Sequence, residues 1–317
     1  MVSENAEAFC RSTTSALPLG QSSSQCYAAG LPLFWRGACI GYSVHDAAST
    51  RISLQTAEPI IDSAFAVWNQ VHCSRGGVVG ISASNVGPVR CGEVQYRVNG
   101  PNQNVIIFRD ASWPYSDPRN VLSLTTLTFN ADTGEIYDAD MELNTAGSGR
   151  VTAANLGEVM THEVGHFLGL AHATDSSARM FENNTSGTSL AADDIAGLCA
   201  IYPNTNERAV SKSVSSTGAV AADACDSTAR HGFGSGCDEN LVPPDGGTTP
   251  LVPVTSCADP GATNCGTGTQ TTRTTSGCAV GQGMGSAAGC CVFGAFLALA
   301  AGGLGRRRRG RVPADRR

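Results

Sequence analysis

The first two thirds of the chain carry short apolar runs whose spacing predicts both strands and helices. Ile40, Tyr42 and Val44 alternate with small or polar residues, as in a strand with one buried face. Residues 53–71 predict a helix, because their apolar stripe has a period of 3.6: Ile60, Ile61, Ala64, Phe65, Val67 and Trp68. Residues 93–98 and 104–109 are further short strand candidates.

A hairpin over residues 122–144 is the clearest pair of elements. Two β-rich runs flank the sequence NADTGE, which has Asp and Gly where turns use them. Apolar residues of the second run share one face, and three acids share the other: Asp138, Asp140 and Glu142. Two interpretations stay open for the acids. One is a half-buried strand with a solvated acidic face, and the other is a Ca²⁺ site, because Ca²⁺ takes hard oxygen ligands.

Two helices are predicted farther along the chain. The first covers residues 151–170, with Thr152 as its expected N-cap. The second is short and covers residues 189–203, with acids in its first turn and Pro203 directly after its end.

The composition changes after Pro203. Residues 205–277 are rich in Ser, Thr, Gly, Ala and Pro, and their one aromatic residue is Phe233. Such a segment buries too little apolar surface to fold as an ordinary domain, so we expect a stalk. Small disulfide loops, Cys225 to Cys237 and Cys257 to Cys265, are expected within it.

Cysteine usage favours an exported protein. Thirteen cysteines in 317 residues fit an oxidising compartment better than the cytosol. Residues 1–18 lack the apolar run of an export signal, so we expect the true start upstream of Met1 or a trimmed chain. Six cysteines precede Pro203 and are expected to be mostly paired: Cys10, Cys26, Cys39, Cys73, Cys91 and Cys199. The specific prediction is Cys73 with Cys91, which closes a short loop.

Charge is distributed unevenly along the chain. The formal net charge is −6, but residues 306–317 hold seven Arg and one Asp, or about +6. The preceding part therefore carries about −12 (−6 minus +6). This excess of negative charge argues against nucleic acid as a partner of the main domain.

The sequence HEVGHFLGLAH, residues 162–172, carries the candidate chemistry. His162 and His166 are four apart on a helix, so both rings project from one face and can reach one Zn²⁺. Glu163 stands beside the first ligand, where its carboxylate can reach a water on the metal. Gly169 allows the chain to turn and bring His172 back as a third ligand. Three protein ligands leave a position open, which is typical of a catalytic site.

The longer run HEVGHFLGLAHATDSSARM resembles the signature of metzincin zinc proteases, and within them the matrixins. LAADDIAGLCAIY also resembles the final matrixin helix. The resemblance covers roughly residues 30–204. It implies an α+β fold with a mixed, mostly parallel twisted sheet, an antiparallel edge strand, two long helices and a C-terminal helix. It further implies that the three histidines are zinc ligands, that Glu163 is the general base, and that Met180 lies beneath the metal.

The activity implied is that of a zinc-dependent endopeptidase acting on extracellular proteins or peptides. A substrate would lie along the edge strand near Leu124 and Thr126 and add a strand to the sheet. The alternative is a surface-displayed binding or adhesion module on an inactive scaffold. Residues 87–94 superficially resemble a propeptide cysteine switch, but they lie inside the expected domain, so a disulfide from Cys91 is the better interpretation.

The C-terminal tail begins at Cys278. It continues with 19 uncharged residues, 287–305, and an Arg cluster, and so resembles the Cys/hydrophobic/Arg sorting tails of myxobacterial surface proteins. In such a tail Cys278 would be processed by a sorting enzyme; a plain membrane anchor is the alternative. The expected organisation is an N-terminal segment (1–29), a catalytic domain (30–204), a stalk (205–277) and the tail (278–317). The expected location is extracellular, anchored at the cell surface or released.

Overall fold

The structure is a computed structural model. It describes residues 9–15, 26, 29–74, 76–115, 119–147, 151–184, 187–210, 219–238 and 271–276. The expected loop between Cys257 and Cys265 and the tail that begins at Cys278 lie outside these residues.

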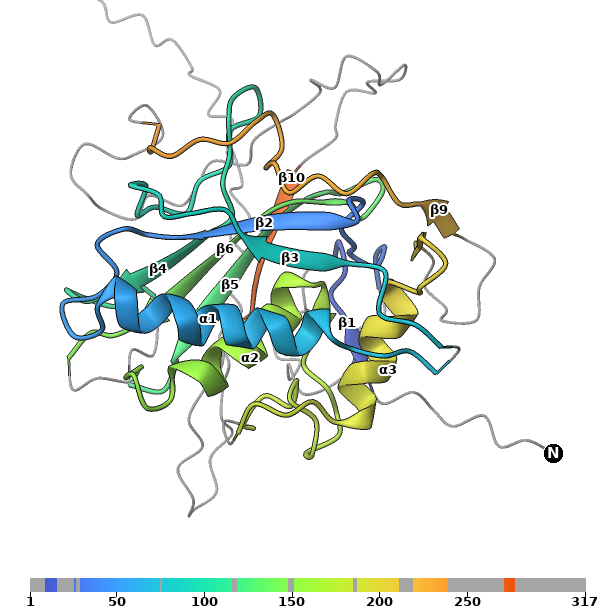
Figure 1. Ribbon diagram of the computed structural model, residues 1–317, viewed down its shortest axis with the longest axis horizontal. Coiled ribbons are helices and arrows are strands. Elements are labelled where there is room, and N and C mark those ends of the chain that lie inside the picture. The colour runs from blue at the N-terminus through green and yellow to red at the C-terminus, as the bar shows by residue number, and fades with distance from the viewer. Residues whose placement is uncertain are drawn as a thin grey trace, which may run out of the picture.

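A twisted mixed sheet forms the centre of the molecule (Figure 1). Among the described residues its strand order is β10-β5-β6-β4-β2-β3. The bounds are β2 (Cys39–Val44), β3 (Ser82–Asn85), β4 (Val105–Arg109), β5 (Ser123–Asn130), β6 (Ile136–Asn144) and β10 (Thr271–Ser276). Strands β3, β2, β4 and β6 are parallel, whereas β5 runs antiparallel to β6. The predicted mostly parallel sheet with an antiparallel strand is confirmed.

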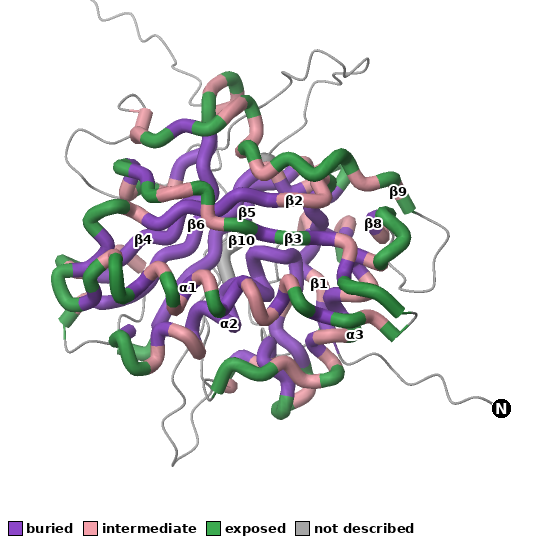
Figure 2. Tube along the Cα trace, in the orientation of Figure 1, coloured by how far each residue is buried: buried purple, intermediate pink, exposed green. Residues whose placement is uncertain are grey.

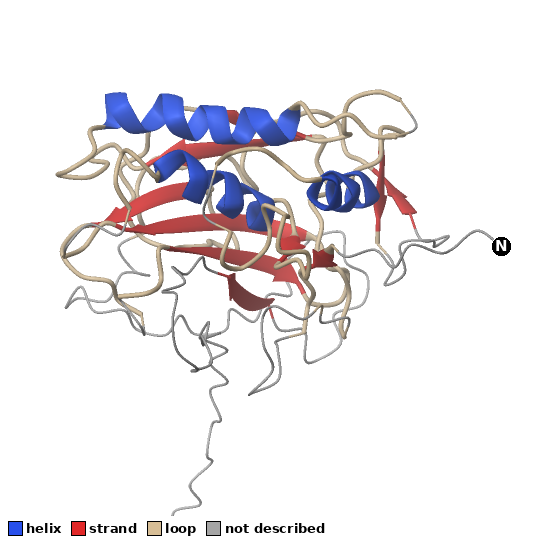
Figure 3. Ribbon diagram, turned by 90° about the horizontal axis from the view of Figure 1, so that it is seen from below, coloured by secondary structure: helices blue, strands red, loops and turns tan. Residues whose placement is uncertain are grey.

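The predicted helices are also present, and they gather on one side of the sheet (Figure 3). They are α1 (Leu54–Asn69), α2 (Leu156–Phe167) and α3 (Ala192–Ile201). Ser53 caps α1 by accepting the Thr56 N–H. The expected N-cap Thr152 is wrong, because α2 begins after Asn155, whose side chain instead accepts the Thr152 N–H at 2.7 Å.

Aromatic side chains between the helices and the sheet hold the two layers together. Tyr42 of β2 stacks on Phe65 of α1 with ring centroids 3.7 Å apart, and Phe65 meets Phe167 of α2 edge to face at 5.3 Å. Trp68 of α1 donates its indole N–H to the Thr161 carbonyl of α2 at 2.8 Å. Figure 2 shows the resulting buried interior along the strands and the inner helix faces. Burial of such large rings is a main source of folding free energy.

The acidic face of β6 contradicts one of the two interpretations offered by its sequence. Asp138, Asp140 and Glu142 are buried, so a solvated acidic face is wrong. Asp140 accepts the backbone N–H groups of Gln95 (3.0 Å) and Val105 (2.9 Å). The Ca²⁺ interpretation stays a prediction. Residues 93–98, expected as a strand, are the loop that covers this face.

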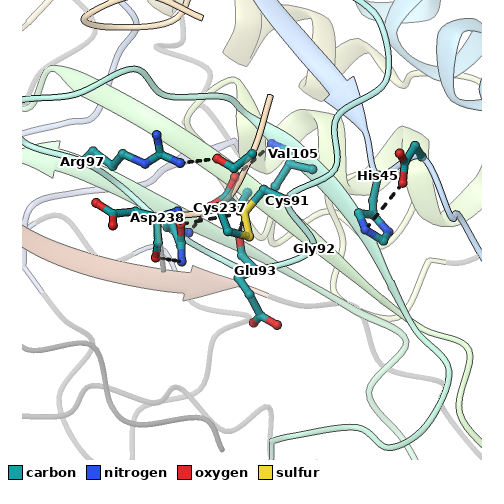
Figure 4. Close-up of a disulfide and its surroundings, with 12 residues drawn as sticks. His45, Cys91, Gly92, Glu93, Arg97, Val105, Cys237 and Asp238 are labelled. Atoms are coloured by element: carbon teal, nitrogen blue, oxygen red, sulfur yellow. Dashed lines mark hydrogen bonds and ion pairs between the residues drawn. A yellow bond between two sulfur atoms is a disulfide. The ribbon is translucent and has the colours of Figure 1, made fainter. Parts of the chain in front are cut away.

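Three of the four disulfides in the described part of the chain join segments that are distant in sequence. Among the described residues the four are Cys10–Cys26, Cys39–Cys225, Cys73–Cys199 and Cys91–Cys237. The expectation that the six cysteines before Pro203 are mostly paired is confirmed. The predicted Cys73–Cys91 and Cys225–Cys237 pairs are wrong. The fold places Cys73, just after α1, against Cys199 of α3, and it places Cys91 against Cys237 (Figure 4).

The first described part of the expected stalk packs on the domain. Arg208, in β8 (Glu207–Ala209), is buried and donates to the carbonyls of Trp35, Gly37 and Gly80, each at 2.9 Å. Strand β8 pairs with β9 (Ala219–Ala221). A free spacer is therefore wrong for residues 207–210 and 219–238. Disulfides and backbone pairing hold this segment, so its low apolar content did not prevent docking.

The N-terminal segment also joins the domain. Strand β1 (Cys10–Arg11) pairs antiparallel with β7 (Leu170–Ala171), and Phe9 is buried. None of the helices in the described part of the chain is long and apolar enough to span a membrane.

Candidate metal centre

Helix α2 and the turn after it bring the three predicted histidines together. The Nε2 atom of His166 lies 3.1 Å from that of His162 and 3.2 Å from that of His172. One ligand atom from each ring falls within 4.8 Å of the others. The turn depends on Gly169, whose φ of +92° favours glycine and whose Cα faces the Leu33 carbonyl.

Backbone carbonyls orient two of the rings. The Nδ1 of His162 lies 2.7 Å from the Arg179 carbonyl oxygen, and the Nδ1 of His166 lies 2.9 Å from that of Leu170. A carbonyl can only accept, so each Nδ1 carries the proton and each Nε2 presents its lone pair to the centre. Burial lowers the pKa of all three imidazoles, that of His166 to about 4. They are therefore neutral at neutral pH, which is the state that binds a metal ion.

This donor set fits zinc. Three neutral imidazole nitrogens converge on one point, and outer hydrogen bonds fix the rings, as is usual for histidine ligands. Among the described residues, His45 and His72 are not part of this cluster.

Glu163 is fully buried on the sheet side of α2. The Ser123 hydroxyl donates to its Oε1 at 2.6 Å, and the Thr125 hydroxyl donates to its Oε2. Burial raises the pKa of Glu163 to about 7, while both hydroxyls oppose that rise. A carboxyl group with a pKa near 7 can both accept and release a proton at neutral pH.

Ser123 and Thr125 did not emerge from the sequence as site residues. They alternate on β5 with the predicted substrate residues, Leu124 and Thr126. Opposite β6, Leu124 pairs with Glu142 and Thr126 with Asp140. Since neighbouring side chains on a strand point to opposite faces, Leu124 and Thr126 point away from Glu163. The sequence did hold a signal for them, because small polar residues alternate along this strand with the residues predicted to bind the substrate.

Met180 lies directly against α2 beneath the histidines. Its sulfur is so near Gly165 that any side chain at that helix position would clash with it. Asp194 of α3 fixes the turn by accepting the N–H groups of Arg179 (2.7 Å) and Met180 (3.0 Å). The Met180 carbonyl accepts the Ala173 N–H at 2.8 Å, next to the third histidine. The three predicted histidines thus converge on one point, while Glu163 lies on the same helix and Met180 packs against that helix at Gly165.

The chain belongs to the matrixin family, whose sequence model matches residues 34–203.

Several matrixins resemble part of the chain. Human matrix metalloproteinase-20 is 36% identical over 95 residues, which are 29% of this chain and 19% of that protein. Metalloendoproteinase 1-MMP of Arabidopsis thaliana is 40% identical over 77 residues, 23% of this chain and 20% of that protein. Human matrix metalloproteinase-26 is 30% identical over 127 residues, 38% of this chain and 46% of that protein. The chain thus spans from about a fifth to about half of these relatives' length.

Proposed function

We propose that this protein is a zinc-dependent endopeptidase that cleaves extracellular proteins or peptides. The observation that carries the proposal is the convergence of three neutral imidazoles, two of them oriented by backbone carbonyls, on a helix that also carries a buried carboxyl group. An adhesion module would need neither the convergent nitrogens nor the adjacent carboxyl group. Family membership supports the same general activity.

His162, His166 and His172 would hold the zinc ion. When bound, zinc lowers the pKa of water and stabilises negative charge that develops on a carbonyl oxygen. The carbonyls of Arg179 and Leu170 keep two of the rings in place for this role. Met180 would support the histidines from below through its contact with α2 at Gly165.

Glu163 would act as the general base and then as the acid. Its carboxylate would accept a proton from the attacking water and pass it to the leaving amine of the cleaved peptide bond. Ser123 and Thr125 would hold the carboxylate in one orientation during both transfers. A fixed orientation reduces the entropy lost on reaching the transition state.

Strand β5 would bind the substrate backbone at the positions of Leu124 and Thr126. Two features support this: β5 is antiparallel to the next strand, and Glu163 contacts its alternate residues. An extended peptide would add a strand beside it, so that backbone hydrogen bonds supply affinity.

The proposed organisation follows the sequence prediction with one change. Residues 30–204 form the catalytic domain, and the docked segments on either side complete it.

The disulfides fit an exported protein. We place the protein outside the cell, held at the surface by residues 278–317 or released after a sorting enzyme acts at Cys278. Intact mass spectrometry of the native protein and of Cys278→Ser tests this: an unmodified wild-type chain ending at Arg317 would contradict processing.

Cleavage of a denatured protein tests the activity. Wild type should cleave it, a chelator should stop cleavage, and added zinc should restore it. Glu163→Ala, prepared in the same way, is the matched control. If wild type with stoichiometric zinc cleaves no faster than Glu163→Ala, the protease assignment fails and the adhesion alternative takes its place.

A further inference from the structure

Strand β10 occupies the outer edge of β5. Its six residues, Thr271–Ser276, pair antiparallel with β5 from Thr271 opposite Asn130 to Ser276 opposite Thr125 (Figure 1). In the chain β10 is far from the rest of the sheet, and residues 239–270 separate it from the docked segment. Without β10, β5 would be an edge strand with a row of unpaired N–H and C=O groups.

The covered edge belongs to the strand that contacts the proposed base. The pairing ends at Thr125, the same residue whose hydroxyl donates to Glu163. A peptide that adds a strand to β5 needs the backbone groups of β5 that β10 now faces. The two cannot pair with that edge over the same residues.

The centre itself is closed in the same structure. Glu163 and His162 are 0% exposed, His166 is 1% exposed and His172 is 2% exposed. The proposed reaction needs a substrate carbonyl beside the three histidines, and these side chains offer it almost no accessible surface. The occupied edge and the buried centre both agree with an arrangement that has no substrate bound.

We propose that β10 is an autoinhibitory strand that holds the substrate edge of this protease until it is displaced. This inference rests on the proposed function. The segment TTRTTS suits the role: it is rich in β-branched residues, and it lacks large apolar residues that would anchor it permanently. Among the described strands it pairs with β5 alone, so its release breaks a single short ladder.

The inhibition is competitive and intramolecular. A strand within the same chain meets its edge at a high effective concentration, of the order of millimolar for short flexible connections. Displacement of β10 would free β5 without altering the groups that carry the reaction. The apparent KM for a peptide would then fall while kcat stays the same.

The test uses the full chain with two substitutions in β10, Thr274→Pro and Thr275→Pro. Neighbouring N–H groups of a strand point to opposite sides, so one of the two substitutions must remove an N–H that faces β5. The matched control, Thr274→Val with Thr275→Val, keeps both N–H groups and the β-branched shape. The proline pair should lower the apparent KM for an unstructured peptide about three- to tenfold, and the valine pair should match wild type. An unchanged KM in the proline pair would overturn the proposal.

Amide hydrogen exchange separates this proposal from the protease assignment. In metal-free Glu163→Gln protein, the proline pair should quicken exchange at alternate amides of Thr125–Asn130, and the valine pair should not. Unchanged exchange would overturn the pairing itself. If exchange quickens but no variant cleaves faster than Glu163→Ala, the protease assignment fails, and the inhibitory role fails with it.

Discussion

Two fully buried glutamates lie near β5, on opposite faces of the sheet, and their partners differ. Glu142 of β6 pairs with the Arg109 guanidinium at 2.6 Å and accepts a hydrogen bond from Tyr115. Glu163 of α2 accepts from two neutral hydroxyls, those of Ser123 and Thr125. A guanidinium cation faces Glu142, whereas the partners of Glu163 are uncharged and burial raises its pKa to about 7. The comparison separates a carboxylate that holds the fold from one suited to catalysis.

Arg109→Met should give the largest effect on stability. It leaves Glu142 buried without its cation, and removal of one partner from such a pair costs about 3–5 kcal/mol. Denaturant unfolding measures the loss. If the free energy of unfolding falls by less than about 1 kcal/mol, the value typical of an exposed pair, the Arg109–Glu142 pair does not stabilise the fold and the contrast with Glu163 is lost.

Glu163 should make the metal-free protein less stable as the pH rises. Its pKa is raised from 4.5 to about 7, so between these values the folded state binds a proton that the unfolded state has lost. Stability relative to Glu163→Gln should be greatest below pH 4.5 and should fall by about 3 kcal/mol by pH 7 and above. Thermal unfolding of both proteins across that range is the measurement. Parallel curves would show that Glu163 is no more perturbed than an exposed carboxylate.

Asp194 extends the comparison to a third kind of partner, because this buried carboxylate accepts hydrogen bonds from backbone N–H groups. Asp194→Ala leaves the N–H groups of Arg179, Met180 and Ala191 without that acceptor, and we expect a loss of about 2 kcal/mol. The loosened turn should also lower zinc affinity. Asp194→Asn keeps one acceptor oxygen and is the control, so equal losses in both variants would argue against this role.

Ser123→Ala and Thr125→Val test the hydroxyls and should give the smallest effect. Each removes one donor to Glu163, worth about 1 kcal/mol. Turnover should fall about fivefold in each variant, with KM for a peptide little changed. Ser123→Thr keeps a hydroxyl and should recover most of the rate. A change confined to KM would show that these residues act on substrate binding and not on Glu163.

The centre was predictable from the sequence where its geometry is local. His162, Glu163 and His166 lie within two turns of one helix, and Gly169 determines the return to His172. Helical spacing alone brings such residues together. The β5–β6 hairpin was predictable for a similar reason, because its two strands are neighbours in the chain. The parallel strands were implied only by the resemblance to matrixins.

The parts that were missed depend on contacts between distant segments. Ser123 and Thr125 reach Glu163 across about 40 residues, and Cys91 reaches Cys237 across 146. Spacing along the chain gives no sign of such contacts, and the rule that close cysteines pair gave wrong partners. The segment around Arg208 looked too polar to fold, yet it docks through hydrogen bonds and disulfides that hydropathy does not measure.

The most direct test of the central claim compares zinc content and turnover in the same preparations. His162→Ala, His166→Ala and His172→Ala should each lower zinc occupancy, because each removes one of three ligands. Glu163→Ala should keep its zinc and lose turnover, because the base is not a ligand. Equal zinc loss in all four variants, or full turnover in Glu163→Ala, would contradict the account.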